Sequence, residues 1–229
     1  MAYKHFFFDL DNTLTESKCI ISDDMVKAIK KLKGDIIVIS GAEKKQIRKQ
    51  IKPICSLWRL YILAQSGSDC PYWKVKLVKS QKKEVYNHLT KIKNFFPHYF
   101  ENGDDDLLQD RGCQLSFSFI GHNADLQKKK AFDRGGLFRK TVLKTIPFES
   151  KTLEVKVGGT TCLDYTNKNG TKGRNIDKFI DYKKWNKEEC IYFGDALFEG
   201  GNDETVIGVI DTMEVSNPLD LINKLKKFI

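Results

Sequence analysis

The feature that most constrains this sequence is an apolar run at residues 3–10, YKHFFFDL, which leads directly into two aspartates. A second short apolar run, IIVI at residues 36–39, leads into a serine and a glycine. Short apolar runs bounded by polar residues are typical of parallel strands that are buried on both faces. Between the two runs, apolar residues recur at helical spacing after Ser22, a residue type that caps helix amino termini. The amino-terminal segment therefore predicts a strand, a helix and a second parallel strand.

The alternation of short apolar runs with segments of helical spacing continues along the chain and returns at its carboxyl end. Helices are predicted at 43–54, 175–182 and 217–228, and strands at 61–64, 189–193 and 205–210. The middle differs, because residues 114–121 and 151–159 alternate as antiparallel strands with one exposed face do. Residues 79–96 and 125–140 have helical spacing. We therefore predict an α/β fold: a doubly wound, mostly parallel, Rossmann-like core of residues 1–71 and 167–229, with an inserted α+β domain of residues 72–166.

Length and composition exclude several classes of protein. The 229 residues are 41% hydrophobic, which is enough for one large domain or for a core with an insertion. No apolar run approaches the roughly 20 residues that cross a bilayer, and the amino terminus lacks the apolar region of a secretory signal. We therefore expect a cytoplasmic protein without membrane association. The net charge of +9 is scattered, with the densest basic run at 128–130, which argues against nucleic acid as a partner.

The two aspartates after the first strand, Asp9 and Asp11, are the first candidate site. They are two residues apart at the carboxyl end of a predicted parallel strand, which is where open α/β sheets bind ligands. Two carboxylates this close repel each other unless a cation or a proton lies between them. A Mg²⁺ site removes the repulsion. The alternative, if this segment stood alone, is a turn with two solvated acids.

A second acidic loop and a lysine strengthen this interpretation. The segment FGDALFEGGND, residues 193–203, follows another apolar strand and places Asp195 and Asp203 at the same edge of the sheet. Oxygen ligands from two loops suit octahedral Mg²⁺, whereas the alternative is an acidic surface loop. Lys172 precedes a predicted helix, so its ammonium could neutralise phosphoryl charge beside the helix amino terminus. Taken by itself, Lys172 would be an ordinary loop lysine.

At these motifs the chain resembles the haloacid dehalogenase (HAD) superfamily of phosphotransferases. DLDNTLT is similar to the first motif of that superfamily, and Ser40, Lys172 and GDALFEGGND match the other three in the right order. The insertion lies between the second and third motifs, as does the α/β cap of subclass IIB. Within that subclass, FGDALFEGGND and DRGCQLSFSFIGHNA resemble segments of phosphomannomutases.

The resemblance implies a mechanism and a set of roles. Asp9 would attack phosphorus to give an aspartyl-phosphate, and Asp11 would act as general acid and base. Mg²⁺ would bind Asp9, the Asp11 carbonyl and Asp195, with Asp203 supporting the metal or Lys172. The phosphoryl oxygens would contact Lys172 together with Ser40 and Gly41. The register of this second motif is open by a residue or two, because a shifted alignment places Ala42 at the hydroxyl position.

Departures from the phosphomannomutase pattern leave the reaction open. That family has cap arginines for a second phosphate, and only Arg111 matches one here, since His122 and Lys129 stand at the other two positions. Lysine and neutral histidine lack the bidentate grip of a guanidinium on phosphate. The remaining substrate-binding candidates are Lys18, in place of a core arginine, and Cys162 and Asp164, in place of a serine and an aspartate. We therefore keep two candidate reactions, which are interconversion of hexose 1- and 6-phosphates and hydrolysis of a sugar phosphate. The expected partner is a phosphorylated sugar, and the resemblance leaves room for a homodimer formed through the cap.

Overall fold

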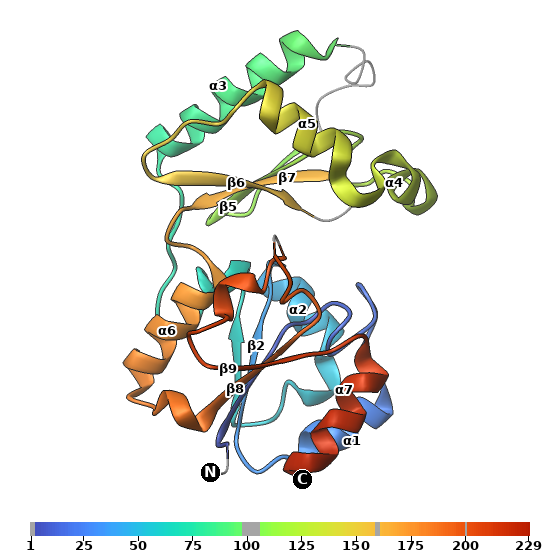
Figure 1. Cartoon of the computed structure of the whole chain (residues 1–229), viewed down its shortest axis with the longest axis vertical. Coiled ribbons are helices and arrows are strands. Elements are labelled where there is room, and N and C mark those ends of the chain that lie inside the picture. Colours follow the sequence, from blue (N-terminus) through green and yellow to red (C-terminus); the bar gives the residue numbers. More distant parts are fainter. Residues whose placement is uncertain (1–2, 98–105, 159–160, 200) are drawn as a thin grey trace. The chain divides into compact units, whose positions relative to one another are not determined.

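The structure is a computed structural model that describes residues 3–97, 106–158, 161–199 and 201–229 (Figure 1). The chain divides into two compact units, which we call the core unit, Met1–Lys74 with Asn169–Ile229, and the cap unit, Val75–Lys168. The core unit contains a parallel sheet between helices, and the cap unit contains an antiparallel sheet with helices. This architecture confirms the predicted fold class, a doubly wound parallel core with an inserted α+β domain.

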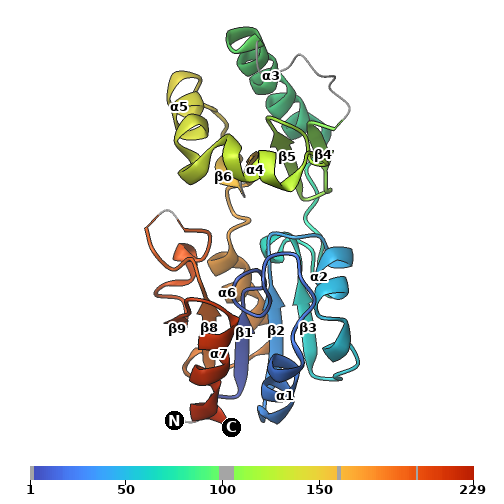
Figure 2. The ribbon, with the colours of Figure 1, turned by 90° about the vertical axis from the view of Figure 1, so that its right-hand side faces the viewer.

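The core sheet has five parallel strands in the order β3-β2-β1-β8-β9 (Figure 2). The strands are β1 (His5–Phe8), β2 (Asp35–Ile39), β3 (Leu60–Leu63), β8 (Cys190–Gly194) and β9 (Asp211–Glu214). At the centre, Phe8 of β1 lies opposite Val38 of β2 and Phe193 of β8. Because the strands are parallel, the loops that follow β1, β2 and β8 all begin at the same edge of the sheet.

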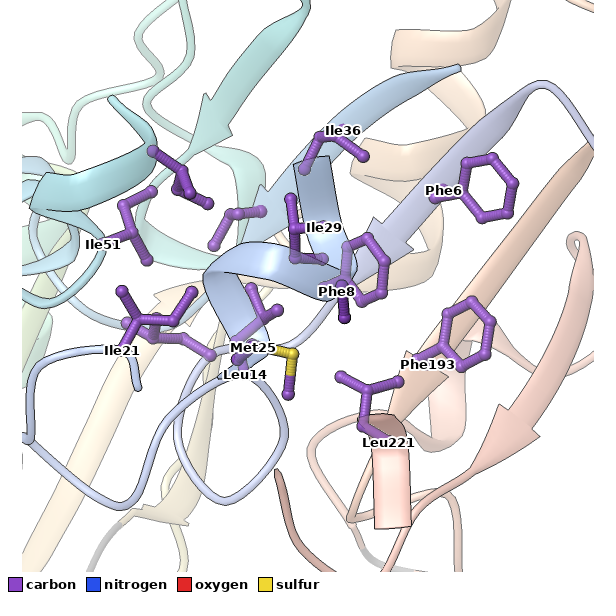
Figure 3. Close-up of a cluster of buried hydrophobic side chains, with 14 of the residues drawn as sticks. Phe6, Phe8, Leu14, Ile21, Met25, Ile29, Ile36, Ile51, Phe193 and Leu221 are labelled. Atoms are coloured by element: carbon purple, nitrogen blue, oxygen red, sulfur yellow. The ribbon is translucent and has the colours of Figure 1, made fainter. Parts of the chain in front are cut away.

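Helices cover both faces of the core sheet because successive strand side chains point to opposite faces. Phe6 and Phe8 pack with apolar residues of three helices, namely α1 (Asp23–Lys31), α2 (Lys44–Gln50) and α7 (Pro218–Leu225) (Figure 3). Phe7 packs on the other face with residues of α6 (Lys172–Lys183). At the start of α1, the Ser22 side chain accepts a hydrogen bond from the Met25 backbone N–H, as expected of a helix cap.

The cap sheet has four antiparallel strands in the order β4-β5-β7-β6. They are β4 (Leu108–Asp110), β5 (Gln114–Ser118), β6 (Leu153–Gly158) and β7 (Cys162–Asn167). Helices α3 (Lys79–Phe95) and α5 (Leu137–Thr145) cover one face, where Leu115 and Phe117 of β5 are buried, and α4 (Leu126–Phe132) lies beside them (Figure 1).

The alternate residues of β5 and β7 give the cap sheet a second, polar face. Ser116 pairs with Asp164 across the two strands, and Ser118 pairs with Cys162. We call the face that carries these four residues the polar cap face. Pairs on one face of an antiparallel sheet bring side chains from distant parts of the chain into contact.

Two predicted elements differ from the structure. The predicted strand at 205–210 is wrong: Glu204–Val206 is a 3-10 turn, and Gly208 has φ +82°. Val206 and Ile210 are buried with the α6 residues, and a left-handed glycine between them prevents an extended path. The polar segment Asp211–Glu214 forms the edge strand instead.

The prediction of a single continuous helix at 125–140 is also wrong. It consists of α4 and α5, separated by Gly135 and Gly136, both of which have positive φ. Strands β4 and β7 had no predicted counterpart. None of the helices within the described residues is both long and apolar enough to cross a bilayer.

Candidate active site

Three aspartates from two loops of the core unit converge. Asp9 directly follows β1 and Asp195 directly follows β8, and these strands are hydrogen-bonded neighbours. Asp203 lies further along the loop that begins with Asp195. One carboxylate oxygen of each residue lies within 4.8 Å of the others. The sheet register therefore produces an acidic cluster from residues far apart in the sequence.

Lys172 lies against this cluster. It is the first residue of α6, and its Nζ forms ion pairs with Asp9 and, at 2.5 Å, with Asp203. A Cβ at the next residue, Gly173, would lie only 1.7 Å from the carbonyl oxygen of Thr205. The helix start thus packs directly on the turn that carries Asp203, and a side chain at position 173 would push the lysine away from its partners.

The Asp203 carboxylate is fully buried and is held by groups of the protein. Its Oδ1 accepts hydrogen bonds from the Tyr192 hydroxyl at 2.6 Å and from Lys172. Its Oδ2 accepts from the Ala196 backbone N–H at 3.3 Å, and a Cβ at Gly194 would approach that oxygen to 2.3 Å. Since both oxygens already have donors, Asp203 acts here mainly as the anchor of Lys172.

Burial and charge together set the ionisation of the cluster. Burial, reinforced by the charges of Asp203 and Asp195 and opposed by Lys172, raises the pKa of Asp9 to about 7. Burial alone would lower the pKa of Lys172, but its two carboxylate partners outweigh it and raise the pKa above the usual value, so the ammonium stays charged. Three carboxylates and one ammonium leave an excess of negative charge that attracts a cation.

The third carboxylate, Asp195, is held by the loop after β1. Asn12, with φ +60°, donates from Nδ2 to Asp195 Oδ2 at 3.3 Å, and the Thr13 hydroxyl lies 3.5 Å from Oδ1. Burial raises the pKa of Asp195, and the hydrogen bond from Asn12 opposes that effect. These contacts are long, so Asp195 has oxygen lone pairs available to a further partner.

The Asp11 carboxylate is oriented separately from this cluster. Its Oδ1 accepts from the Lys18 backbone N–H at 2.7 Å and from the Gln50 side chain at 3.0 Å. Gln50 also donates to the Thr15 hydroxyl at 3.0 Å, which ties the loop after β1 to α2. Lys18 contacts Asp11 through its backbone, and its own side chain is exposed.

The second-motif residues follow β2, the neighbour of β1 on its other side. Ser40 is buried, and its Oγ accepts from the Ala42 backbone N–H at 3.1 Å. A Cβ at Gly41 would meet only the Ser66 Oγ, at 4.0 Å, so the backbone there is open to an incoming group. The hydroxyl of the segment 40–42 belongs to Ser40, at the same sheet edge as Asp9.

The cap candidates come together in the cap unit. His122 Nε2 contacts the Ser116 carbonyl at 2.9 Å. Ser116 donates to Asp164 at 2.5 Å, and Lys129 Nζ donates to the His122 carbonyl at 2.5 Å. Arg111 is half-buried and donates to Gln109 Oε1 at 3.1 and 3.3 Å. Of the predicted cap residues, His122, Asp164 and Lys129 are thus connected through Ser116 and the His122 carbonyl, while Cys162 lies opposite Ser118 in the same sheet.

Two residues of the core site were missed in the sequence. Tyr192 lies within the apolar strand segment ECIYF, where a buried phenol needs a hydrogen-bond partner, and this was an available signal. Gln50 gave no such signal, because a glutamine near the end of a charged helix is ordinarily solvated. Its contact with Asp11 depends on how the loop after β1 passes α2.

The donor set of the core site fits a hard divalent cation. Carboxylate oxygens are the ligands that Mg²⁺ takes in proteins, and Asp9 and Asp195 are the two whose oxygens are least occupied by protein donors. The chain offers no cysteine or histidine in this cluster among the described residues, which disfavours softer metals there.

The chain is similar in sequence to known phosphomannomutases. No family model matches the chain. The phosphomannomutase of Encephalitozoon cuniculi is 23% identical over 241 residues, covering 96% of this chain and 91% of the relative. The phosphomannomutase of Galdieria sulphuraria is 24% identical over 247 residues, covering 96% and 92%.

Solved structures share the fold at lower identity. A sugar phosphatase of HAD subclass IIB aligns with a TM-score of 0.64 and 18% identity, covering 98% of each chain. An IMP-bound, N-terminally truncated IMP-nucleotidase of Plasmodium falciparum aligns with a TM-score of 0.65 and 15% identity, covering 99% of this chain and 68% of that one. Both alignments extend over the core and the cap units.

Proposed function

We propose that the chain is a phosphomannomutase-like member of HAD subclass IIB, and that it is a Mg²⁺-dependent phosphotransferase that acts on sugar phosphates through an aspartyl-phosphate. The observation that carries the proposal is the ion pair of Lys172 with Asp9 at the carboxyl end of the central strand. A buried carboxylate beside a charged ammonium is placed to meet an incoming phosphoryl group.

Each core residue has a chemical task in this proposal. Asp9 attacks phosphorus and the bond to the leaving oxygen breaks, while Asp11, held by Gln50 and Lys18, gives that oxygen its proton. Lys172 places positive charge beside the phosphoryl oxygens, and the Ser40 hydroxyl and the open backbone at Gly41 bind them. Phosphoryl transfer depends mostly on positioning and charge neutralisation, which is what these residues supply.

The metal has a defined place in the proposal. Asp9 and Asp195, with the Asp11 backbone carbonyl, would hold Mg²⁺, while Asp203 holds Lys172. When bound, Mg²⁺ supplies positive charge that neutralises the phosphoryl oxygens. Asp195 is kept in position for this by Asn12 and Thr13.

We propose mutase activity as the leading reaction, with Arg111 as the guanidinium for the second phosphate. Hydrolysis is the second candidate, and a specific observation favours it. At two of the positions that the resemblance gives to phosphate-binding arginines, the side chains are engaged within the cap, since His122 contacts the Ser116 carbonyl and Lys129 donates to the His122 carbonyl. With a guanidinium at only one of these three positions, Arg111, the cap suits a substrate with one phosphate better than a bisphosphate.

The test is a panel of hexose 1- and 6-phosphates, with and without a hexose bisphosphate activator, following free phosphate and isomerised product together. We expect turnover only with Mg²⁺, loss of turnover in excess chelator, and inhibition by Ca²⁺, whose longer bonds misplace the phosphoryl group. Isomerised product assigns a mutase, and free phosphate alone assigns a phosphatase. Full activity in chelator would contradict the metal assignment, and no turnover of any sugar phosphate would contradict the proposed substrate class.

Two further proposals accompany the reaction. We propose a cytoplasmic location, in keeping with a small-molecule phosphotransferase, and a homodimer formed through the cap unit. Light scattering of the purified full chain distinguishes a dimer from a monomer of 26.4 kDa. A monomer at all protein concentrations would contradict the homodimer.

A further inference from the structure

Gln50 is a buried polar side chain at the end of α2, and its amide meets the loop after β1. It is 2% exposed, and its Nε2 donates to two acceptors, Asp11 Oδ1 and the Thr15 hydroxyl, both at 3.0 Å. Its Oε1 accepts from Gln46 Nε2 at 3.3 Å, one turn earlier on the same helix. An amide that is buried and hydrogen-bonded at both ends is held in one orientation.

The surrounding groups determine which end of the Gln50 amide faces Asp11. The Thr15 hydroxyl donates its own proton to the Leu10 carbonyl at 3.4 Å, so toward Gln50 it can only accept. The Asp11 carboxylate also only accepts. The amide nitrogen must therefore lie on this side and the amide oxygen on the other, where Gln46 donates to it.

Both hydrogen bonds to the Asp11 carboxylate reach the same oxygen. Oδ1 accepts from Gln50 and from the Lys18 backbone N–H at 2.7 Å. Both groups present a hydrogen to Oδ1 and neither accepts one there, so a proton on the Asp11 carboxyl group belongs on Oδ2. No residue that the structure describes donates to Oδ2, and Asp11 is half-buried. Oδ2 is thus the oxygen that an incoming group can meet.

We propose that Gln50 is a positioning residue that holds Asp11 by Oδ1 and turns Oδ2 toward the ester oxygen of the substrate. The inference rests on the phosphotransferase function proposed above. In the first half of the reaction the Asp9 carboxylate bonds to phosphorus, the bond from phosphorus to the ester oxygen breaks, and that oxygen takes the proton from Asp11 Oδ2. In the second half an acceptor hydroxyl or water gives its proton to Oδ2, its oxygen bonds to phosphorus, and the bond to Asp9 breaks.

The chemistry of the ester oxygen decides how much this positioning contributes. An alkoxide is a poor leaving group, so a sugar phosphate needs the proton while the bond to phosphorus breaks. A 4-nitrophenolate anion is stable by itself and leaves without a proton. Loss of the Gln50 contact therefore slows the two kinds of ester unequally, whereas a general loss of structure in the loop after β1 slows both alike. Gln50 in this way favours phosphate esters of alcohols as substrates.

The test compares kcat/KM of the wild type and of Gln50→Met for a hexose phosphate, phenyl phosphate and 4-nitrophenyl phosphate, following release of the sugar or phenol with Mg²⁺ present. Methionine keeps the length of the side chain and removes the amide. We expect kcat/KM to fall about 30-fold for the hexose phosphate, about fivefold for the phenyl ester and less than about twofold for the nitrophenyl ester. Lys49→Met, at an exposed position of the same helix, is the matched control and should change none of the three.

The outcomes separate this inference from the function on which it rests. In a folded variant, equal losses for the three esters, or no loss for any, overturn the role of Gln50 and leave the phosphotransferase function intact. A wild type that turns over only the aryl esters contradicts sugar phosphates as substrates, and the phenyl and nitrophenyl pair then decides the role of Gln50. A wild type that is inactive with all three esters overturns both proposals.

A second variant covers the case in which Gln50→Met does not fold, as judged by circular dichroism. Gln50→Asn retains a polar amide, which is one methylene too short to reach Asp11. We expect the same order of losses, largest for the hexose phosphate and smallest for the nitrophenyl ester. Wild-type values of kcat/KM for all three esters in Gln50→Asn overturn the proposal.

Discussion

The candidate site residues of the core and cap units are held in opposite ways. In the core unit, Lys172 is fully buried between two carboxylates, and its position is set by the start of a helix and by Asp203. In the cap unit, Lys129 and Arg111 donate to a backbone carbonyl and to a neutral glutamine, and both are half-buried. A buried ion pair loses several kcal/mol when one partner is removed, whereas half-exposed contacts of this kind are much weaker. The comparison predicts that the buried cluster around Lys172 tolerates little change, whereas substitution of Lys129 or Arg111 costs the fold little.

The largest effect that the comparison predicts is at Asp9. Asp9→Asn keeps the shape of the side chain but removes the nucleophile, so turnover of any phosphate ester should fall by about 10⁴-fold or more. Initial rates with a sugar phosphate and with a small aryl phosphate measure this. Asp24, an exposed residue of α1, provides the control, because Asp24→Asn should leave both rates unchanged. A variant that retains more than a few per cent of the wild-type rate would show that covalent catalysis at Asp9 is wrong.

The next largest effect distinguishes the role of the cap unit from that of the core unit. Arg111→Ala should reduce kcat/KM for a sugar phosphate by about 10²-fold, the scale of losing a charged hydrogen bond of roughly 2–3 kcal/mol. Hydrolysis of a small aryl phosphate, which has no distal group to bind, should change little. Lys83→Ala, an exposed lysine of α3, is the matched control. Equal losses with both substrates would contradict a role of the cap in recognition.

A smaller effect is predicted inside the core. Tyr192→Phe removes the hydroxyl that donates to Asp203 and retains the packing of the ring, so Asp203 should hold Lys172 less firmly. We expect kcat to fall about tenfold with KM nearly unchanged, because one hydrogen bond contributes about 1–1.5 kcal/mol. Steady-state kinetics give the two constants. Tyr182→Phe, on the exposed side of α6, should have no effect, and a rise of KM alone in Tyr192→Phe would show that the hydroxyl acts on substrate binding instead.

The smallest effect concerns the stability of the cap unit. His88 is buried, with Nδ1 on the Tyr165 hydroxyl and Nε2 on the Ile146 carbonyl, both at 2.8 Å, and burial lowers its pKa. Below about pH 6.5 the unfolded chain therefore takes up a proton that the folded cap does not, and stability decreases as the pH falls, by at most about 1.4 kcal/mol per pH unit. His88→Gln should reduce this slope.

Urea unfolding at pH 7.5 and 5.5 measures the slope. All three tryptophans lie in the core unit, so fluorescence follows the core, while far-UV circular dichroism follows both units. The loss of stability between the two pH values should be smaller in His88→Gln than in the wild type by circular dichroism and equal by fluorescence. Identical slopes by circular dichroism would contradict the role of His88.

Much of the core could be predicted from the sequence because its strands are buried on both faces. The runs Phe6–Phe8 and 36–39 are apolar throughout, and the polar residues that follow them, two aspartates after the first and a serine after the second, stand out. The edge strand Asp211–Glu214 could not be found this way, since an edge strand with exposed side chains has no apolar run. In its place the buried residues Val206 and Ile210 gave a false strand signal, although a turn at Gly208 separates them.

The cap was less predictable for a different reason. The pairing of Ser116 with Asp164 and of Ser118 with Cys162 depends on the register of β5 with β7, and register follows from the packing of the opposite face rather than from local sequence. Likewise, the acidic cluster could be predicted from strand ends, whereas the Tyr192 contact that anchors Asp203 required the structure. The roles assigned to the site residues remain predictions until the variants are measured.

The strand order has a consequence for how the chain is made. Strand β1 lies at the centre of the core sheet, but its neighbour β8 is separated from it by more than 180 residues of sequence, while the cap is one continuous segment. During synthesis from the amino terminus, the cap is complete before β8 leaves the ribosome, and until then one edge of the apolar strand β1 has no partner. Unpaired apolar edges of this kind favour aggregation. Nascent chains of this protein therefore depend on rapid pairing of β8 with β1. A slow step in translating residues 169–194 prolongs the time during which the unpaired edge can aggregate.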